Sequence, residues 1–141
     1  MDDMSRWTVA EGVHEDFPLL IRYRTDVLED QFKATPDLVK IIWEMQYASS
    51  TGLPDAKDHL ALDQFEAFLE SSIEAPGVGK LYVVVTTGGV RDFYLYVGDV
   101  QEFIDKFHSA DNSRYPYPIR LEVNRGENGD FYREILASCS E

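Results

Sequence analysis

The alternation of apolar and polar positions is clearest in residues 80–98, where two β-rich runs flank the dipeptide Gly88-Gly89. Residues 81–87 are apolar almost throughout, which is typical of a strand buried on both faces. Residues 91–97 instead alternate between two faces. The faces consist of Phe93, Leu95 and Val97 on one side and Asp92, Tyr94 and Tyr96 on the other. Because paired glycines suit the positive φ angles of a two-residue turn, we predict the central hairpin of a mixed sheet here.

The remaining periodic segments predict further strands and helices around this hairpin. Period-two alternation indicates strands, and apolar residues three and four apart indicate amphipathic helices. The predicted strands are residues 6–12, 17–25, 38–47 and 119–123, and the predicted helices are residues 55–73, 100–109 and 131–136. Asp99, with Glu102 three residues later, is predicted to cap the second helix. The polar residues 26–35 are predicted to form a loop or a short turn.

Residues 38–47 fit two periodicities. A helical stripe would consist of Leu38, Ile41, Ile42 and Met45, and a strand face of Val39, Ile41, Trp43, Met45 and Tyr47. The alternation is strict, and β-branched and aromatic residues dominate the segment. We therefore predict a strand.

From residue 38 on, the predicted order is strand, helix, strand, strand, helix, strand. This order predicts a ferredoxin-like α+β fold, a split β-α-β (βαββαβ) unit with two helices on one face of an antiparallel sheet. We predict a single domain over residues 1–141 with this core at residues 38–124. An N-terminal β-hairpin at residues 6–25 and a tail with a short C-terminal helix at residues 126–141 are additions to the core.

Acidic residues outnumber basic ones by 26 to 13, for a formal net charge of -13. The excess is local: residues 1–30 carry eight acids and three bases and residues 51–78 six acids and one base, whereas residues 79–125 carry six of each. Such a surface repels phosphate backbones, so we expect no nucleic-acid partner. Solubility explains the acidity, and a basic protein partner is the alternative explanation.

Several features bear on the cellular compartment. No apolar run approaches the roughly 20 residues of a membrane span, and the acidic start of the chain is unlike a signal peptide. The single cysteine, Cys139, offers neither a disulfide framework nor a cysteine-based metal site. We expect a cytoplasmic bacterial protein without a membrane partner.

The motifs that suggest catalysis or metal binding are weak. Residues 77–80 resemble a phosphate loop but lead from a helix into a strand, and Leu81 replaces the hydroxyl residue. Asp55, His59 and Asp63 share a helix face but span two turns, too far apart for one ion. No nucleophile elbow or local Ser-His-Asp signature occurs. We predict no catalytic residues, metal or cofactor, and lean against an enzyme.

The tyrosines of the central hairpin are the best candidate for a binding surface. Tyr82, Tyr94 and Tyr96, with Arg91 near the turn, are predicted to form a ligand or partner surface on one sheet face. RNA-recognition motifs stack bases on such a face, but the glycines of that motif are absent and the chain is acidic. A tyrosine face of this kind is more often covered than exposed. Here we expect the N-terminal hairpin, or the second subunit of a homodimer, to cover it.

These residues also carry a family resemblance that spans residues 7–136. Its parts are Trp7 near the start, the tripeptide Gly52-Leu53-Pro54, the hairpin segment 86–96 and the acidic-aromatic segment 130–136. On these residues the chain resembles the domain-of-unknown-function 695 family of small bacterial proteins. Phe131 stands where that family usually has tryptophan. The resemblance implies a ferredoxin-like fold, no established activity and no catalytic residues.

A more distant similarity is to the family of the regulator of ribonuclease activity B, small acidic inhibitors that bind another protein. Together with the charge, it leads to the hypothesis of a non-enzymatic protein-binding or regulatory module. The alternatives are a small-molecule-binding domain or minor enzyme with its site on the tyrosine face, and an immunity-type protein that neutralises a basic partner.

Overall fold

The computed structural model describes residues 7–45, 50, 52–110 and 119–139. They form a mixed α+β structure with a six-stranded sheet in the order β1-β2-β4-β5-β3-β6, in which every neighbouring pair is antiparallel. The strands are β1 (Trp7–His14), β2 (Phe17–Arg24), β3 (Asp37–Glu44), β4 (Gly79–Thr87), β5 (Val90–Val97) and β6 (Ile119–Asn124). The predicted strand at residues 38–47 is therefore confirmed over residues 38–44, and residues 46 and 47 lie outside the described residues.

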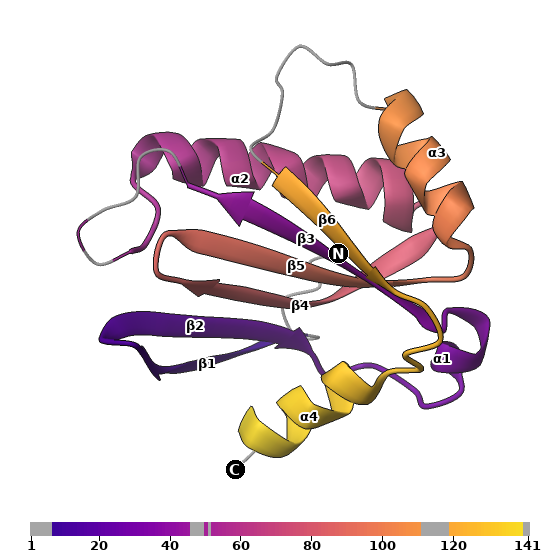
Figure 1. Ribbon diagram of the computed structural model, residues 1–141, viewed down its shortest axis with the longest axis horizontal. Coiled ribbons are helices and arrows are strands. Elements are labelled where there is room, and N and C mark those ends of the chain that lie inside the picture. Colours follow the sequence, from indigo (N-terminus) through magenta and orange to yellow (C-terminus); the bar gives the residue numbers. More distant parts are fainter. Residues whose placement is uncertain (1–6, 46–49, 51, 111–118, 140–141) are drawn as a thin grey trace.

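Helices lie on both faces of this sheet (Figure 1). Helices α2 (Ala56–Leu69) and α3 (Val100–Ala110) cover one face, and α1 (Gln31–Ala34) and α4 (Asp130–Cys139) lie against the other. A π-helical turn, Glu70–Glu74, continues α2. The short helix α1 replaces the predicted loop in residues 26–35, and its Phe32 is buried.

Two apolar clusters lie on the two faces of the sheet. Alternate β5 residues, Phe93, Leu95 and Val97, pack under α2 and α3 as predicted. Leu62, Phe65, Leu69 and Phe103 contribute from the helices to that cluster. The second cluster is largely aromatic and includes Tyr23, Phe32, Tyr82, Tyr96 and Tyr132. The sheet is therefore buried on both faces at its centre.

Local sequence signals explain the central hairpin and the start of α3. Gly88 and Gly89 have φ angles of 58° and 82°, as the two-residue turn requires. The Asp99 side chain accepts hydrogen bonds from the backbone N–H groups of Gln101 and Glu102 at 2.9 and 3.1 Å, so the predicted cap is confirmed.

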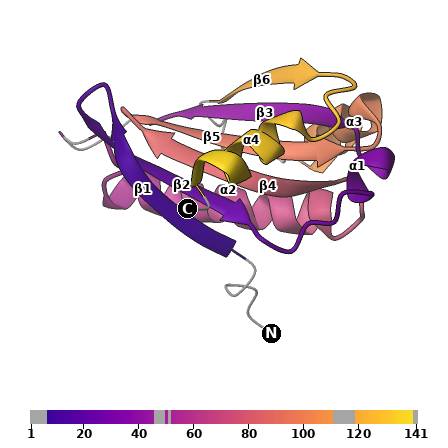
Figure 2. The ribbon, with the colours of Figure 1, turned by 90° about the horizontal axis from the view of Figure 1, so that it is seen from below.

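The N-terminal hairpin does not cover the tyrosine face, contrary to expectation. Instead β2 pairs with β4, so that β1 and β2 extend the sheet sideways (Figure 2). The tyrosine face is covered by α4 and α1. The reason lies in the backbone: β4 has a free side that β2 completes with hydrogen bonds.

Candidate functional site

The four predicted site residues do not lie on one surface. Tyr94 and Tyr96 point toward α4, whereas Arg91, an odd number of residues away on the same strand, points toward α2. Tyr82 joins the tyrosines because the register of β4 shifts between Leu81 and Val83. The shift is an irregularity of the β-bulge kind, which places Tyr82 and Val83 in the same cluster. The predicted surface is therefore divided by the sheet.

The tyrosine face is a filled aromatic core. Tyr82 and Tyr96 are 1% and 0% exposed, and their ring centroids lie 5.0 Å apart. Tyr94 stacks on Phe131 of α4 with centroids 4.1 Å apart. The Tyr132 hydroxyl donates to the Arg24 carbonyl oxygen at 2.5 Å. Helix α4 thus packs against this face, and Tyr82 and Tyr96 are buried within the aromatic cluster.

Burial raises the pKa of Tyr132 to about 12, and it raises the pKa values of Tyr82, Tyr94 and Tyr96 as well. An unfolded tyrosine ionises near pH 10. Above that pH the unfolded chain loses phenol protons that the native chain keeps, so the free energy of unfolding is expected to fall from about pH 10 to pH 12. Urea unfolding and phenolate absorbance at 295 nm test this. In the variant Tyr132→Phe, the free energy of unfolding should decrease less between pH 10 and pH 12. The prediction would be contradicted if Tyr132 of the native protein were half-ionised at pH 10.

A cavity of about 440 Å³ borders Tyr82 where β4 passes α1. Its other polar lining residues include Arg24, Gln31, Glu74 and Lys80. The Tyr82 hydroxyl lies 3.4 Å from the Gln31 side-chain oxygen at its edge. Neither Tyr94 nor Tyr96 lines this cavity.

A groove runs between helix α2 and the extended part of the sheet. It consists of two adjoining cavities of about 390 and 260 Å³, which share Arg22, Asp63 and Glu66 as lining residues. Its floor is formed by residues of β1, β2 and β4, among them Trp7, Val9, Leu20 and Val84. Its wall is formed by helical residues, among them His59, Asp63, Glu66 and Glu70. We call this feature the α2 groove.

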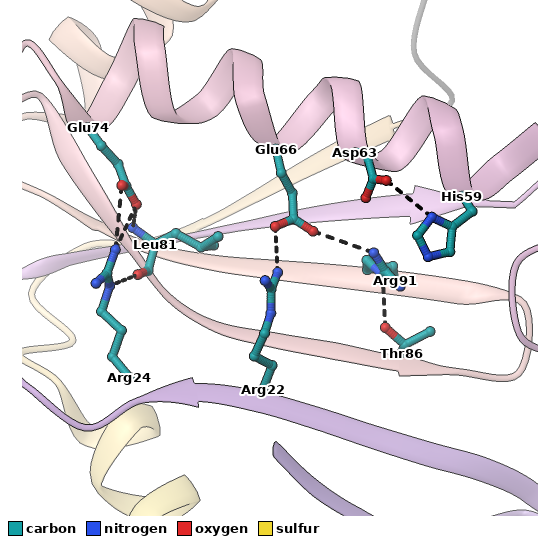
Figure 3. A network of polar contacts seen from close by, with 9 residues as sticks. All are labelled: Arg22, Arg24, His59, Asp63, Glu66, Glu74, Leu81, Thr86 and Arg91. Atoms are coloured by element: carbon teal, nitrogen blue, oxygen red, sulfur yellow. Dashed lines mark hydrogen bonds and ion pairs between the residues drawn. The ribbon is translucent and has the colours of Figure 1, made fainter. Parts of the chain in front are cut away.

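Glu66 is the central charge of the α2 groove (Figure 3). Its Oε1 accepts from Arg22 Nη2 at 2.5 Å, and its Oε2 lies 3.5 Å from Arg91 Nη1. Arg91 Nε also donates to the Thr86 hydroxyl at 2.9 Å. Burial lowers the pKa of Arg91, whereas the nearby Glu66 carboxylate opposes that shift. One carboxylate of α2 thus holds two arginines of different strands.

Arg24 and Glu74 form a second link at the other end of the groove. Arg24 is 7% exposed, and its Nε donates to the Leu81 carbonyl oxygen at 2.6 Å. Glu74 Oε2 accepts from the Leu81 backbone N–H at 2.8 Å and lies 3.4 Å from Arg24 Nη2. The guanidinium groups of Arg22 and Arg24 lie 4.9 and 4.7 Å from the Trp7 ring centroid. These contacts fasten the N-terminal hairpin to the helix side of the sheet.

The residues of the weak metal motif have other roles. The Asp55 side chain accepts from the backbone N–H groups of Lys57 and Asp58 and caps α2. His59 Nδ1 lies 3.2 Å from Asp63 Oδ2, and both side chains are 63% exposed. Among the described residues no group of three or more His, Cys, Asp or Glu side chains could hold a metal ion. The α2 groove offers ion pairing and hydrogen bonding.

The site residues predicted from the sequence did not include Arg22 or Arg24. A signal was available: Glu66, Glu70 and Glu74 recur every four residues along one helix face. The pairing itself joins residues 44 positions apart, as in Arg22 and Glu66, and no local pattern records such a contact.

A family model described as "Family of unknown function (DUF695)" matches residues 5–137. The chain belongs to the DUF695 family. The family resemblance in the sequence is thereby confirmed, and the matched range contains all six strands of this DUF695 protein. No curated protein and no solved structure matches the chain, so the distant similarity to the regulator of ribonuclease activity B stays a prediction.

None of the helices in the described ranges is both long and apolar enough to cross a membrane.

Proposed function

We propose that this DUF695 protein is a non-enzymatic protein-binding or regulatory module that recognises a basic partner. The observation that supports this most directly is the charge around the α2 groove. The arginines inside it are paired with Glu66 and Glu74, whereas Asp63 and Glu70 at its rim are exposed. An acidic rim attracts a cationic surface and speeds its encounter. An immunity-type protein that neutralises a basic partner is a special case of this function.

We also infer that β3 to β6 form a ferredoxin-like core. In support, α2 connects β3 to β4 and α3 connects β5 to β6, which is the β-α-β-β-α-β order, and both helices lie on one sheet face. The hairpin of β1 and β2 is then an addition at the free side of β4.

Binding of a small molecule is the second candidate, and the cavity beside Tyr82 favours it. Binding there requires Lys80 and Gln31, which line that cavity, and not the exposed rim of the α2 groove. A rim variant therefore separates the two functions.

The test compares three immobilised baits in extracts of the native cell: wild type, Asp63→Lys/Glu70→Lys, and Glu102→Lys/Glu134→Lys. The last pair makes the same charge change at exposed positions of α3 and α4. We expect wild type and the control to retain the same basic protein at low salt, and the rim variant and high salt to abolish retention. Equal retention by all three baits, or retention of metabolites alone, would overturn the proposal.

A further inference from the structure

The outer side of β1 is an edge of the sheet. All eight residues from Trp7 to His14 pair with β2 on the inner side, and no described strand lies beyond β1. In an antiparallel ladder alternate residues direct their N–H and C=O groups outward, so this edge presents a row of unpaired backbone groups. Such a row is a template for another strand.

The two edges of the sheet differ in protection. The opposite edge, β6, is shorter and carries the exposed charged residues Arg120 and Glu122, with Arg120 3.4 Å from Glu44. Charges and shortness are the usual means of blocking edge pairing. Strand β1 has eight residues and exposes Val9 and Val13 at 56% and 74%. Of the two, β1 is the edge suited to pairing.

The side chains of β1 that face helix α2 define what an added strand should carry. Val9 lines the α2 groove, so Glu11 and Val13, two and four residues later, project from the same face. Residues directly opposite each other in neighbouring strands interact, and opposite charges there are favourable. An added strand with a basic residue opposite Glu11 and apolar residues on either side would match this face.

Charge decides between a second copy and a different partner. Each copy of the chain has a formal net charge of -13, and the turn beyond β1 adds Glu15 and Asp16 to Glu11. Like charge of this size opposes pairing of two β1 edges, whereas it attracts a cationic segment. The occupant is therefore a basic segment of another protein.

We propose that β1 binds an extended segment of a basic protein by strand addition, with the pattern apolar-x-Lys/Arg-x-apolar facing the α2 side. This inference rests on the proposed function and names the mode of recognition. Main-chain hydrogen bonds supply affinity in strand addition, and the alternate side chains supply specificity.

The test uses four fluorescent nine-residue peptides. The first is Gly-Thr-Val-Thr-Lys-Thr-Val-Thr-Gly, and the second has Glu in place of Lys. The other two are the Lys peptide with alternate backbone amides N-methylated, one for each of the two possible phases. Anisotropy titration at low salt should show binding of the Lys peptide about tenfold tighter than that of the Glu peptide. The N-methylated peptides keep the charge but lose donors along one side or the other, so one of them should bind at least tenfold more weakly. Hydrogen exchange should slow at residues 7–14.

Protein variants provide the matched controls. Glu11→Lys should reverse the preference between the Lys and Glu peptides, and Val13→Lys should weaken binding of the Lys peptide. Glu102→Lys on α3 should change neither. Strand addition would be overturned by any of three results: both N-methylated peptides bind as tightly as the Lys peptide, the Lys peptide does not bind, or hydrogen exchange slows in α2 alone. Concentration-dependent dimerisation that protects residues 7–14 without peptide would overturn it in favour of a second copy. The bait experiment with the rim variant decides the basic-partner proposal separately.

Discussion

Phe65→Ala is expected to lower the free energy of unfolding by about 3–5 kcal/mol. Phe65 is 0% exposed, and its ring centroid lies 5.2 Å from that of Trp43, 5.3 Å from that of Phe93 and 6.3 Å from that of Phe107. The truncation removes contacts to β3, β5 and α3 at once. The close-packed surroundings can fill the resulting cavity only in part. Urea unfolding monitored by far-ultraviolet circular dichroism measures the effect.

Leu60→Ala on the same helix is the matched control, because Leu60 is 61% exposed and its loss should cost no more than about 0.5 kcal/mol. Phe65→Leu retains most of the apolar volume, so its loss in the free energy of unfolding should lie between those of Phe65→Ala and Leu60→Ala. This variant keeps the comparison informative if Phe65→Ala does not fold. Equal stability of Phe65→Ala and Leu60→Ala would contradict the assignment of Phe65 to the centre of the core.

Gly129→Ala is expected to be the second most damaging change, at about 2–4 kcal/mol, because two costs coincide. Gly129 has a φ of 91°, where an L side chain is strained. A Cβ there would also lie 2.7 Å from three ring atoms of Phe32, which is 3% exposed. Phe32 in turn contacts Tyr82 and Tyr96, so the clash reaches the aromatic core.

Gly126→Ala separates the two costs. Gly126 also has a positive φ, 69°, but nothing lies within 4 Å of a Cβ added there. This variant should therefore lose only about 1 kcal/mol, the cost of the backbone strain. Thermal or urea unfolding of both variants tests the difference. If Gly126→Ala were as destabilising as Gly129→Ala, the contact between residue 129 and Phe32 would not matter to stability.

Most secondary structure could be predicted from local patterns. The positive φ angles at Gly88-Gly89 follow from the absence of a Cβ, and the cap of α3 follows from the short acidic side chain of Asp99. The alternation of Phe93, Leu95 and Val97 with the tyrosines also held, because a strand's side chains project to opposite faces. Each of these signals is contained within a few residues.

The candidate site was less predictable. The tyrosine surface was expected to include Arg91, but strand alternation directs that side chain to the α2 groove. Tyr82 lies on the same face as Tyr94 and Tyr96 only because the register of β4 is irregular near Val83, and no local sequence pattern predicted that irregularity. The link between Arg22 and Glu66 depends on where β2 and α2 meet. These arrangements depend on packing between distant segments.

The order of the strands and of the three longer helices, the hairpin turn, the acidic charge and the family could all be predicted from the sequence, because periodicity, turn chemistry and composition are properties of neighbouring residues. Three arrangements were visible in the folded chain alone: α1 and α4 cover the tyrosines, the N-terminal hairpin continues the sheet, and β1 is left as an edge beside the α2 groove. The physical reason is that strand pairing and helix docking are chosen by the contacts that bury the most apolar surface and complete the most backbone hydrogen bonds, and those contacts join residues far apart in the chain.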